Sequence, residues 1–259
     1  MNLLERGVDL SPASFFTSPF ETRRVSVFRM MNRFFTMLGL PFCLAAIFSL
    51  SGNAAASPEW VNLFEGNKLD GWLQRGGKAK YRVEQDQLIG VAVPGTGNSF
   101  LCTTHDYTNF VLELDFKTSI GLNSGVQIRS HSFHVPTEFD HNGKLIKISA
   151  GRVHGYQVEI DPSERAWSGG IYDEARRGWL NDLKRNEAAR KAYKSNDWNH
   201  FRIEATAGAI KTSLNGLPAA DLKDTTTPSG FIALQVHSVG SRTNLMEVRF
   251  RNVRIKQLP

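Results

Sequence analysis

Short runs of alternating apolar and polar residues, separated by Gly, Asn and Pro, fill most of the chain after about residue 57. The clearest run covers 154–161, with Tyr156, Val158 and Ile160 on one face and Gln157, Glu159 and Asp161 on the other. Side chains of a strand point alternately to its two faces, so this run predicts a strand with one apolar and one polar face. Pro162 has no N–H for a sheet ladder, and we expect the strand to end there.

The spacing of these runs predicts an all-β fold, a sandwich of two antiparallel sheets. Asn215-Gly216 between two alternating runs predicts a tight hairpin turn. One short helix is expected over 187–193, with Asn186 as its N-cap. The polar insertion 132–152 is long enough that we expect it to be functional or disordered.

The N-terminal segment has a different composition. A short basic region at Asn32-Arg33, an apolar run over 34–50 and small residues at 54–56 together resemble a secretory signal peptide. We therefore expect residues 1–56 to be an N-terminal extension and signal peptide, with Met30 or Met31 as the true start. Residues 57–259 then form one domain, exported to the periplasm or the medium after cleavage near Ala56, and without a membrane span.

Charge and cysteine content narrow the possible partners. Of the 31 basic and 25 acidic residues, five and three lie in 1–56, which leaves a net charge of +4 after cleavage. No Lys/Arg stripe accompanies this mild excess, so nucleic acid is not an expected partner. Cys102 is then the only cysteine, which excludes an intrachain disulfide and suits a small buried strand residue.

Four predicted strands carry polar side chains of similar kinds on one face. These are Glu113 and Asp115; Gln127 and Arg129; Gln157, Glu159 and Asp161; and Gln235 and His237. Amides, carboxylates, a guanidinium and an imidazole together suit a polar binding site more than an ordinary wet sheet face. Trp167 and Tyr172 follow in a predicted loop, where their rings could stack on the apolar faces of a sugar.

Simpler interpretations exist for several of these residues. A polar strand face is often only the solvated side of an antiparallel sheet. Arg129 could form a structural ion pair with Glu159 or Glu113, and His237 could be a hydrogen-bonded strand histidine.

Several segments together resemble the 3-keto-disaccharide hydrolase family. They are F-E-G-N-K-L-D-G-W (64–72), L-N-S-G-V-Q-I-R-S (122–130), G-Y-Q-V-E-I-D (155–161), G-F-I-A-L-Q-V-H-S (230–238) and V-R-F-R-N-V-R-I (248–255). The resemblance spans about Trp60 to Lys256. It implies a concanavalin A-like jelly roll whose site lies on the concave sheet, and a glycoside substrate with its C3 hydroxyl oxidised to a ketone.

The chemistry of such a substrate fits the residues above. A C3 ketone acidifies the C2 proton, so a base can remove it and the C1 substituent can leave by elimination. The route needs a base (Glu159 or His237), a stabiliser of the enolate oxygen (Arg129 or a divalent metal ion) and an acid for the leaving group. The substrate-binding set would be Gln127, Gln157, Asp161, Gln235, Trp167, Tyr172 and Glu113, and no nucleotide cofactor is required.

Two alternatives remain open. Glu159, Asp161 and Glu164 match the E-x-D-x-x-E pattern of retaining β-glucanases, which use carboxylates on one strand face. A carbohydrate-binding module of the lectin or laminin-G type would use the same fold without catalysis.

Overall fold

A computed structural model describes residues 58–66 and 68–259 of the protein. The signal peptide expected within residues 1–56 lies outside the described residues, so that expectation stays a prediction. In the described part of the chain, no helix has both the length and the apolar character needed to cross a membrane.

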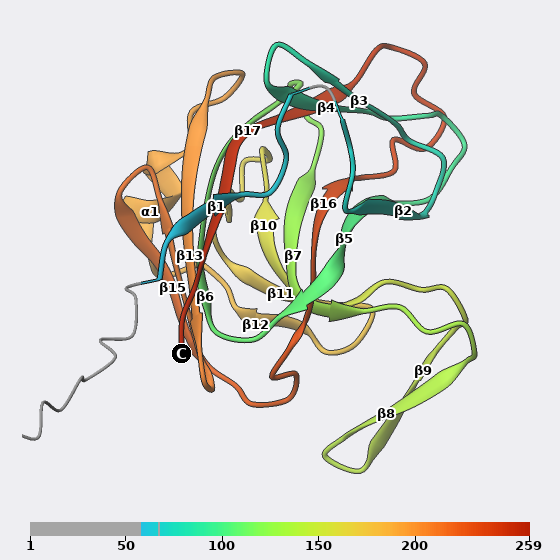
Figure 1. The fold of residues 1–259 in the computed structure, drawn as a ribbon, viewed down its shortest axis with the longest axis vertical. Helices are drawn as coiled ribbons and strands as arrows, with labels where there is room; N and C mark the ends of the chain where they lie inside the picture. The colour runs from blue at the N-terminus through green and yellow to red at the C-terminus, as the bar shows by residue number, and fades with distance from the viewer. Residues whose placement is uncertain (1–57, 67) are drawn as a thin grey trace, which may run out of the picture. The chain divides into compact units, whose positions relative to one another are not determined.

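Two large antiparallel sheets form a sandwich (Figure 1), which confirms the all-β jelly-roll prediction. The eight-stranded sheet has the order β15 (Leu217–Lys223), β14 (Ala209–Leu214), β13 (Asn199–Thr206), β6 (Phe110–Thr118), β17 (Glu247–Gln257), β4 (Gln87–Val91) and β3 (Lys80–Glu84), and β1 (Trp60–Asn62) also pairs with β17. The seven-stranded sheet has the order β12 (Gly178–Asn181), β11 (Ile171–Glu174), β10 (His154–Ile160), β7 (Ser124–His131), β16 (Gly230–Val236), β5 (Ser99–Tyr107) and β2 (Trp72–Gly76).

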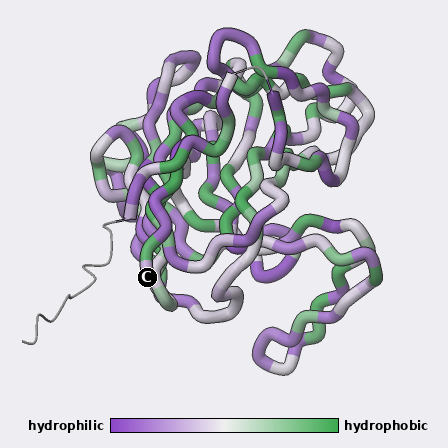
Figure 2. Tube along the Cα trace, viewed as in Figure 1, coloured by the Kyte–Doolittle hydropathy of each residue, from purple (hydrophilic) through white to green (hydrophobic). Residues whose placement is uncertain are grey.

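The core lies between the two sheets and takes the apolar face of each strand. Tyr156, Val158 and Ile160 of β10 are fully buried in it, together with Phe116 of β6 and Phe201 of β13. Figure 2 shows hydrophobic stretches along the strands and hydrophilic ones in most connecting loops. The alternation in the sequence therefore identifies correctly which face of β10 is apolar, and it leaves the opposite face of the sheet free for polar groups.

Two short connecting elements, a helix and a tight turn, lie where the sequence predicts them. The helix α1 (Glu187–Ala192) begins after Asn186, whose side-chain oxygen accepts a hydrogen bond from the Ala189 N–H. Asn215 and Gly216 both have positive φ, as the tight turn between β14 and β15 requires.

Two other segments are more regular than expected. The insertion forms a hairpin of β8 (Thr137–His141) and β9 (Lys144–Ile148), which extends away from the sandwich in Figure 1. The predicted loop after Pro162 contains the hairpin of β11 and β12, which adds two strands to the edge of the seven-stranded sheet.

A β-bulge interrupts β7 at Arg129 and Ser130. The pairing with β10 shifts there, because Tyr156 lies opposite Ile128 but His154 lies opposite His131. Arg129 adopts a positive φ of 45°. An extra residue in one strand redirects the side chains around it.

The bulge corrects the expectation that Arg129 belongs to the polar face. It is 1% exposed, and its side chain reaches the β5–β6 connection between the two sheets and the β13–β14 turn of the opposite sheet. There the guanidinium donates hydrogen bonds to the carbonyl oxygens of Thr108 and Ala207, each at 2.7 Å. Arg129 therefore connects the two sheets; it forms neither of the ion pairs considered above.

Glu113 is also placed differently from the prediction. It lies on β6 of the eight-stranded sheet, on the face turned away from the core, between Arg202 of β13 and Arg254 of β17. Its carboxylate accepts from these arginines at 2.6 and 2.7 Å. Burial raises the pKa of Glu113, but the two arginines lower it more, so the pKa lies below its usual value.

Replacing Arg129 by Met should lower the thermal stability of the protein. The substitution removes the two hydrogen bonds that the charged guanidinium donates to the Thr108 and Ala207 carbonyls, and a hydrogen bond to a charged group contributes about 1.5–3 kcal/mol. We expect a Tm lower by at least about 4 °C in calorimetry. Arg82→Met on the partly exposed β3 is the control and should shift Tm little. Equal Tm values for the two variants would contradict the structural role of Arg129.

Candidate active site

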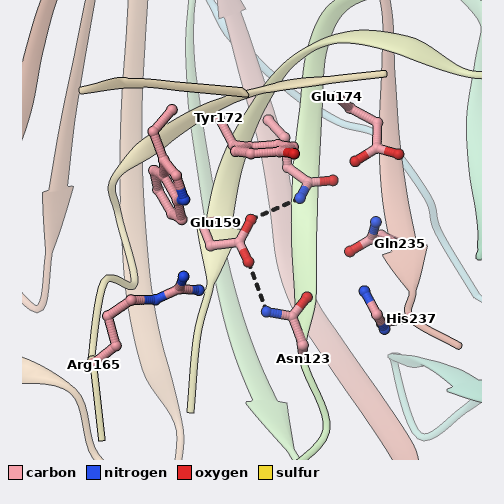
Figure 3. Close-up of a pocket in the computed structure, with 9 residues that line it drawn as sticks. Asn123, Glu159, Arg165, Tyr172, Glu174, Gln235 and His237 are labelled. Atoms are coloured by element: carbon pink, nitrogen blue, oxygen red, sulfur yellow. Dashed lines mark hydrogen bonds between the residues drawn. The ribbon is translucent and has the colours of Figure 1, made fainter. Parts of the chain in front are cut away.

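A cavity of about 280 Å³ opens on the face of the seven-stranded sheet that is turned away from the core (Figure 3). This volume is near the lower end of the range for small-molecule sites. The lining residues are Asn123, Gln157, Glu159, Arg165, Tyr172, Glu174, Trp179, Gln235 and His237.

Strand register explains why residues distant in sequence meet here. β7 lies between β10 and β16, with Glu159 opposite Gly125 on one side. On the other side, Leu234 lies opposite Val126, so Gln235 falls beside Gly125 as well. Glu159 and Gln235 are thus two strand spacings apart, about 10 Å between their Cα atoms, with no side chain between them. A Cβ at Gly125 would lie 2.6 Å from the Gln157 side chain, so glycine gives this amide its space.

Glu159 forms the floor of the cavity and is held at both oxygens. Asn123 donates to Oε1 at 2.6 Å and Gln157 donates to Oε2 at 2.7 Å, and both bonds are drawn in Figure 3. Burial raises the pKa of the Glu159 carboxyl above its usual value, and these two donors offset only part of the rise. The result is a carboxylate of increased basicity with a fixed orientation.

A chain of hydrogen bonds behind the floor fixes the direction of the Gln157 amide. Ser130 donates to Gln127 Oε1 at 2.7 Å, and Gln127 Nε2 donates to Gln157 Oε1 at 2.7 Å. Gln157 therefore presents its N–H group to Glu159. Gln127 is fully buried and acts behind Gln157 instead of lining the cavity.

Aromatic rings form one wall of the cavity. Tyr172 of β11 and Trp179 of β12 meet edge to face, with ring centroids 5.3 Å apart. Trp167 does not line the cavity, but its ring packs against Trp179 with the two ring centroids 4.8 Å apart. Such rings can stack on the apolar face of a sugar.

A cation lies at the edge of this wall. The Arg165 guanidinium is 4.8 Å from the Trp167 ring and 5.0 Å from the Trp179 ring. Asp161 accepts a hydrogen bond from Arg165 Nε at 2.8 Å. Asp161 is 2% exposed and does not line the cavity. Its role is therefore to position Arg165 and not to contact a ligand.

Glu174 supplies a second buried carboxylate. It lies on β11 and forms an ion pair with Arg152, which follows the β8–β9 hairpin. Burial raises the pKa of Glu174, and the charges of Arg152 and His237 reduce the rise. His237 directly follows β16 and lines the same cavity.

The structure brings together part of the predicted set. Gln157, Glu159, Tyr172, Gln235 and His237 line the cavity; Gln127, Asp161 and Trp167 lie behind it; and Arg129 and Glu113 lie elsewhere.

Four lining residues were not selected from the sequence: Asn123, Arg165, Glu174 and Trp179. Asn123 immediately precedes β7, in the turn before a run already singled out. The other three lie in the Trp- and Arg-rich segment after Pro162, whose composition was the available signal.

The E-x-D-x-x-E segment does not form a row of carboxylates. Asp161 Oδ1 accepts from Ser163 Oγ at 2.6 Å, so this carboxylate is turned into the following loop. Glu164 is exposed and lies outside the cavity lining. Across residues 58–66 and 68–259, no three His, Cys, Asp or Glu side chains are grouped to hold a metal ion.

Solved structures of similar fold include two from Bacillus subtilis. One is the carbohydrate binding module CBM66, with 17% identity and a TM-score of 0.50, covering 72% of this chain and 96% of that one. The other is a protein of unknown function with a galectin-like fold, with 13% identity and a TM-score of 0.54, covering 73% and 90%. At these identities the similarity shows the fold alone.

Among curated protein sequences, none matches the chain. The family model described as "3-keto-alpha-glucoside-1,2-lyase-like domain" matches residues 59–256, which include both sheets and every residue of the cavity. The chain belongs to the family of 3-keto-α-glucoside-1,2-lyase-like domains.

Proposed function

We propose that the protein cleaves 3-keto-glycosides by removing the C2 proton and eliminating the C1 substituent. One observation carries the proposal. Glu159 is a buried carboxylate with a raised pKa, held by two amide donors at the floor of a sugar-sized cavity. A carboxylate of raised pKa is a better general base than an ordinary surface one. Membership of the family supports the choice of an oxidised sugar.

The reaction begins with transfer of the C2 proton to Glu159. The electron pair of the C2–H bond enters the C2–C3 bond, and the ketone oxygen becomes an enolate oxyanion. Return of these electrons forms the C1=C2 double bond and breaks the C1–O bond. The leaving oxygen takes a proton from an acid, and the sugar is released as a 2-hydroxy-3-keto-glycal that water can hydrate in a later step.

The cavity contains a group for each of these tasks. Arg165, and not Arg129, would stabilise the enolate oxygen. It is the arginine that lines the cavity, and its positive charge can stabilise an oxyanion. Glu174 and His237 are the two candidates for the acid: burial raises the pKa of Glu174, whereas its ion pair with Arg152 favours the charged form, and His237 lines the same cavity. Tyr172 and Trp179 hold the ring of the sugar.

A carbohydrate-binding module is the second candidate. The aromatic wall and the fold shared with CBM66 favour it, because stacking and amide contacts suffice for binding. Two buried carboxylates of raised pKa on one cavity have no evident use in binding alone, and they favour the enzyme.

Cleavage assays should separate these possibilities. With methyl 3-keto-α-glucoside and its unoxidised counterpart, each tested with and without a chelator, we expect only the oxidised glycoside to release methanol. A transient enone absorbance should accompany the release. Equal cleavage of both glycosides would instead indicate a conventional glycosidase, and binding of sugars without turnover would indicate a binding module.

Glu159→Gln should reduce the cleavage rate by about 10²–10⁴-fold, because it removes the general base while keeping the shape of the side chain. Glu164→Gln is the matched control: Glu164 is exposed and outside the cavity, five residues along the chain, and its variant should retain the wild-type rate. If both variants cleave at the wild-type rate, Glu159 is not the base.

The rate should fall at acid pH as Glu159 takes up a proton, with a midpoint above the usual glutamate value of 4.5. Asn123→Leu should move this midpoint to higher pH, since the Asn123 N–H stabilises the charged form and lowers the pKa. The carboxyl ¹³C shift of Glu159, followed by NMR, gives the same titration without an activity assay. The other charged or titratable groups near it are unchanged in this variant; they are Asp161, Arg165, Tyr172, Glu174 and His237. A midpoint that stays in place or moves down would contradict the assigned role of Asn123.

A further inference from the structure

Gln235 differs from the other buried amides of the site. Its side chain is completely buried from solvent, yet it lines the cavity. Neither Nε2 nor Oε1 has a hydrogen-bond partner among the described residues. In contrast, both amide atoms of Gln157 are bonded within the protein. Figure 3 shows Gln235 beside His237, across the cavity from Glu159.

A buried amide without partners is unfavourable for folding, because it loses its bonds to water and gains none in return. Such groups are rare in proteins, and a ligand that completes the bonding is one explanation. Here the residue that carries the two unsatisfied atoms lines a cavity whose other side holds the candidate base. The amide is therefore placed to meet a bound molecule.

We propose that the Gln235 amide binds the ketone oxygen of the substrate and a hydroxyl next to it. This inference rests on the proposed function for the identity of the ligand. A carboxamide presents an N–H donor and a carbonyl acceptor side by side. A ketone oxygen can only accept, and a neighbouring hydroxyl can donate, so the two pairs are complementary.

The position of Gln235 agrees with this arrangement. Glu159 and Gln235 lie on either side of Gly125, and the Gln157 amide lies over this glycine, so one sugar ring above that amide can touch both. When Glu159 removes the C2 proton, negative charge develops on the ketone oxygen. The Nε2–H bond to this oxygen then becomes stronger, which makes Gln235 an oxyanion donor that acts together with Arg165.

The test compares Gln235→Met with Gln157→Met. Methionine keeps approximately the length of the glutamine side chain and has no amide. Because the Gln235 amide has no protein partner, its variant should keep the wild-type Tm or exceed it by about 2–4 °C. Gln157→Met removes bonds to Gln127 and Glu159, and its Tm should fall.

Binding is measured with 1,5-anhydro-3-keto-glucitol, which carries the ketone but has no glycosidic substituent at C1. Calorimetry should show affinity for the wild-type protein and at least about tenfold weaker binding to Gln235→Met. With methyl 3-keto-α-glucoside, kcat should fall by about 10²–10³-fold, the usual effect of losing one oxyanion donor.

Three results would overturn the inference. They are a Tm loss in Gln235→Met as large as that in Gln157→Met, unchanged binding of the keto analogue by this variant, and no binding of the analogue by the wild-type protein. The proposed function fails in a different way: if Gln235-dependent binding occurs without cleavage of any 3-keto-glycoside, the ligand contact stands and the elimination chemistry does not.

Discussion

The bulge in β7 is the constraint on which both the sandwich and the site depend. Gly155 on one neighbouring strand and Gly230 on the other leave space for it: an added Cβ would lie 2.9 Å from Ser130 Cα in the first case and 2.6 Å from the Arg129 carbonyl carbon in the second. With this space, Arg129 turns toward the opposite sheet and donates to the carbonyls of Ala207 in one of its turns and of Thr108 in the connection between the sheets. Ser130 turns the other way, toward Gln127. One irregularity thus connects the sheets and begins the polar chain that ends at Glu159.

That chain determines the chemistry of the floor. Each amide in it has one orientation, because Ser130 donates to Gln127, Gln127 to Gln157, and Gln157 to Glu159. Glu159 receives donors at both oxygens and so is held as an acceptor, although burial raises its pKa. A general base must meet one particular proton in a fixed direction, so hydrogen bonds that fix the orientation of its carboxylate favour this role. The unpaired amide of Gln235 is the opposite case: its partners are supplied only by the ligand.

Alternation in the sequence predicts which side chains share a face of a strand, but not which strands share a sheet. Gln157 and Glu159 therefore share a face as predicted and both line the cavity, whereas Glu113 has the same pattern on β6 of the other sheet, where it pairs with arginines. Arg129 was misplaced because a bulge breaks the period of two, and only the glycines on the flanking strands hint at it. The β11–β12 hairpin lies in a segment for which the sequence predicts a loop, because this Gly-, Trp- and Arg-rich stretch has no clear alternation. Its residue Glu174 therefore became visible only once the strands were paired.

The central claim is that Glu159, oriented by its amide donors, removes the C2 proton of an oxidised sugar. It is tested most directly by proton NMR of 1,5-anhydro-3-keto-glucitol in D₂O with the protein present, because this compound has no glycosidic substituent to eliminate and therefore reports removal of the C2 proton. We predict that the C2–H signal disappears through exchange with solvent deuterium, that the unoxidised alcohol keeps its signal, and that the exchange is lost in Glu159→Gln. Exchange at the same rate in that variant, or no exchange above the rate in buffer, would contradict the account.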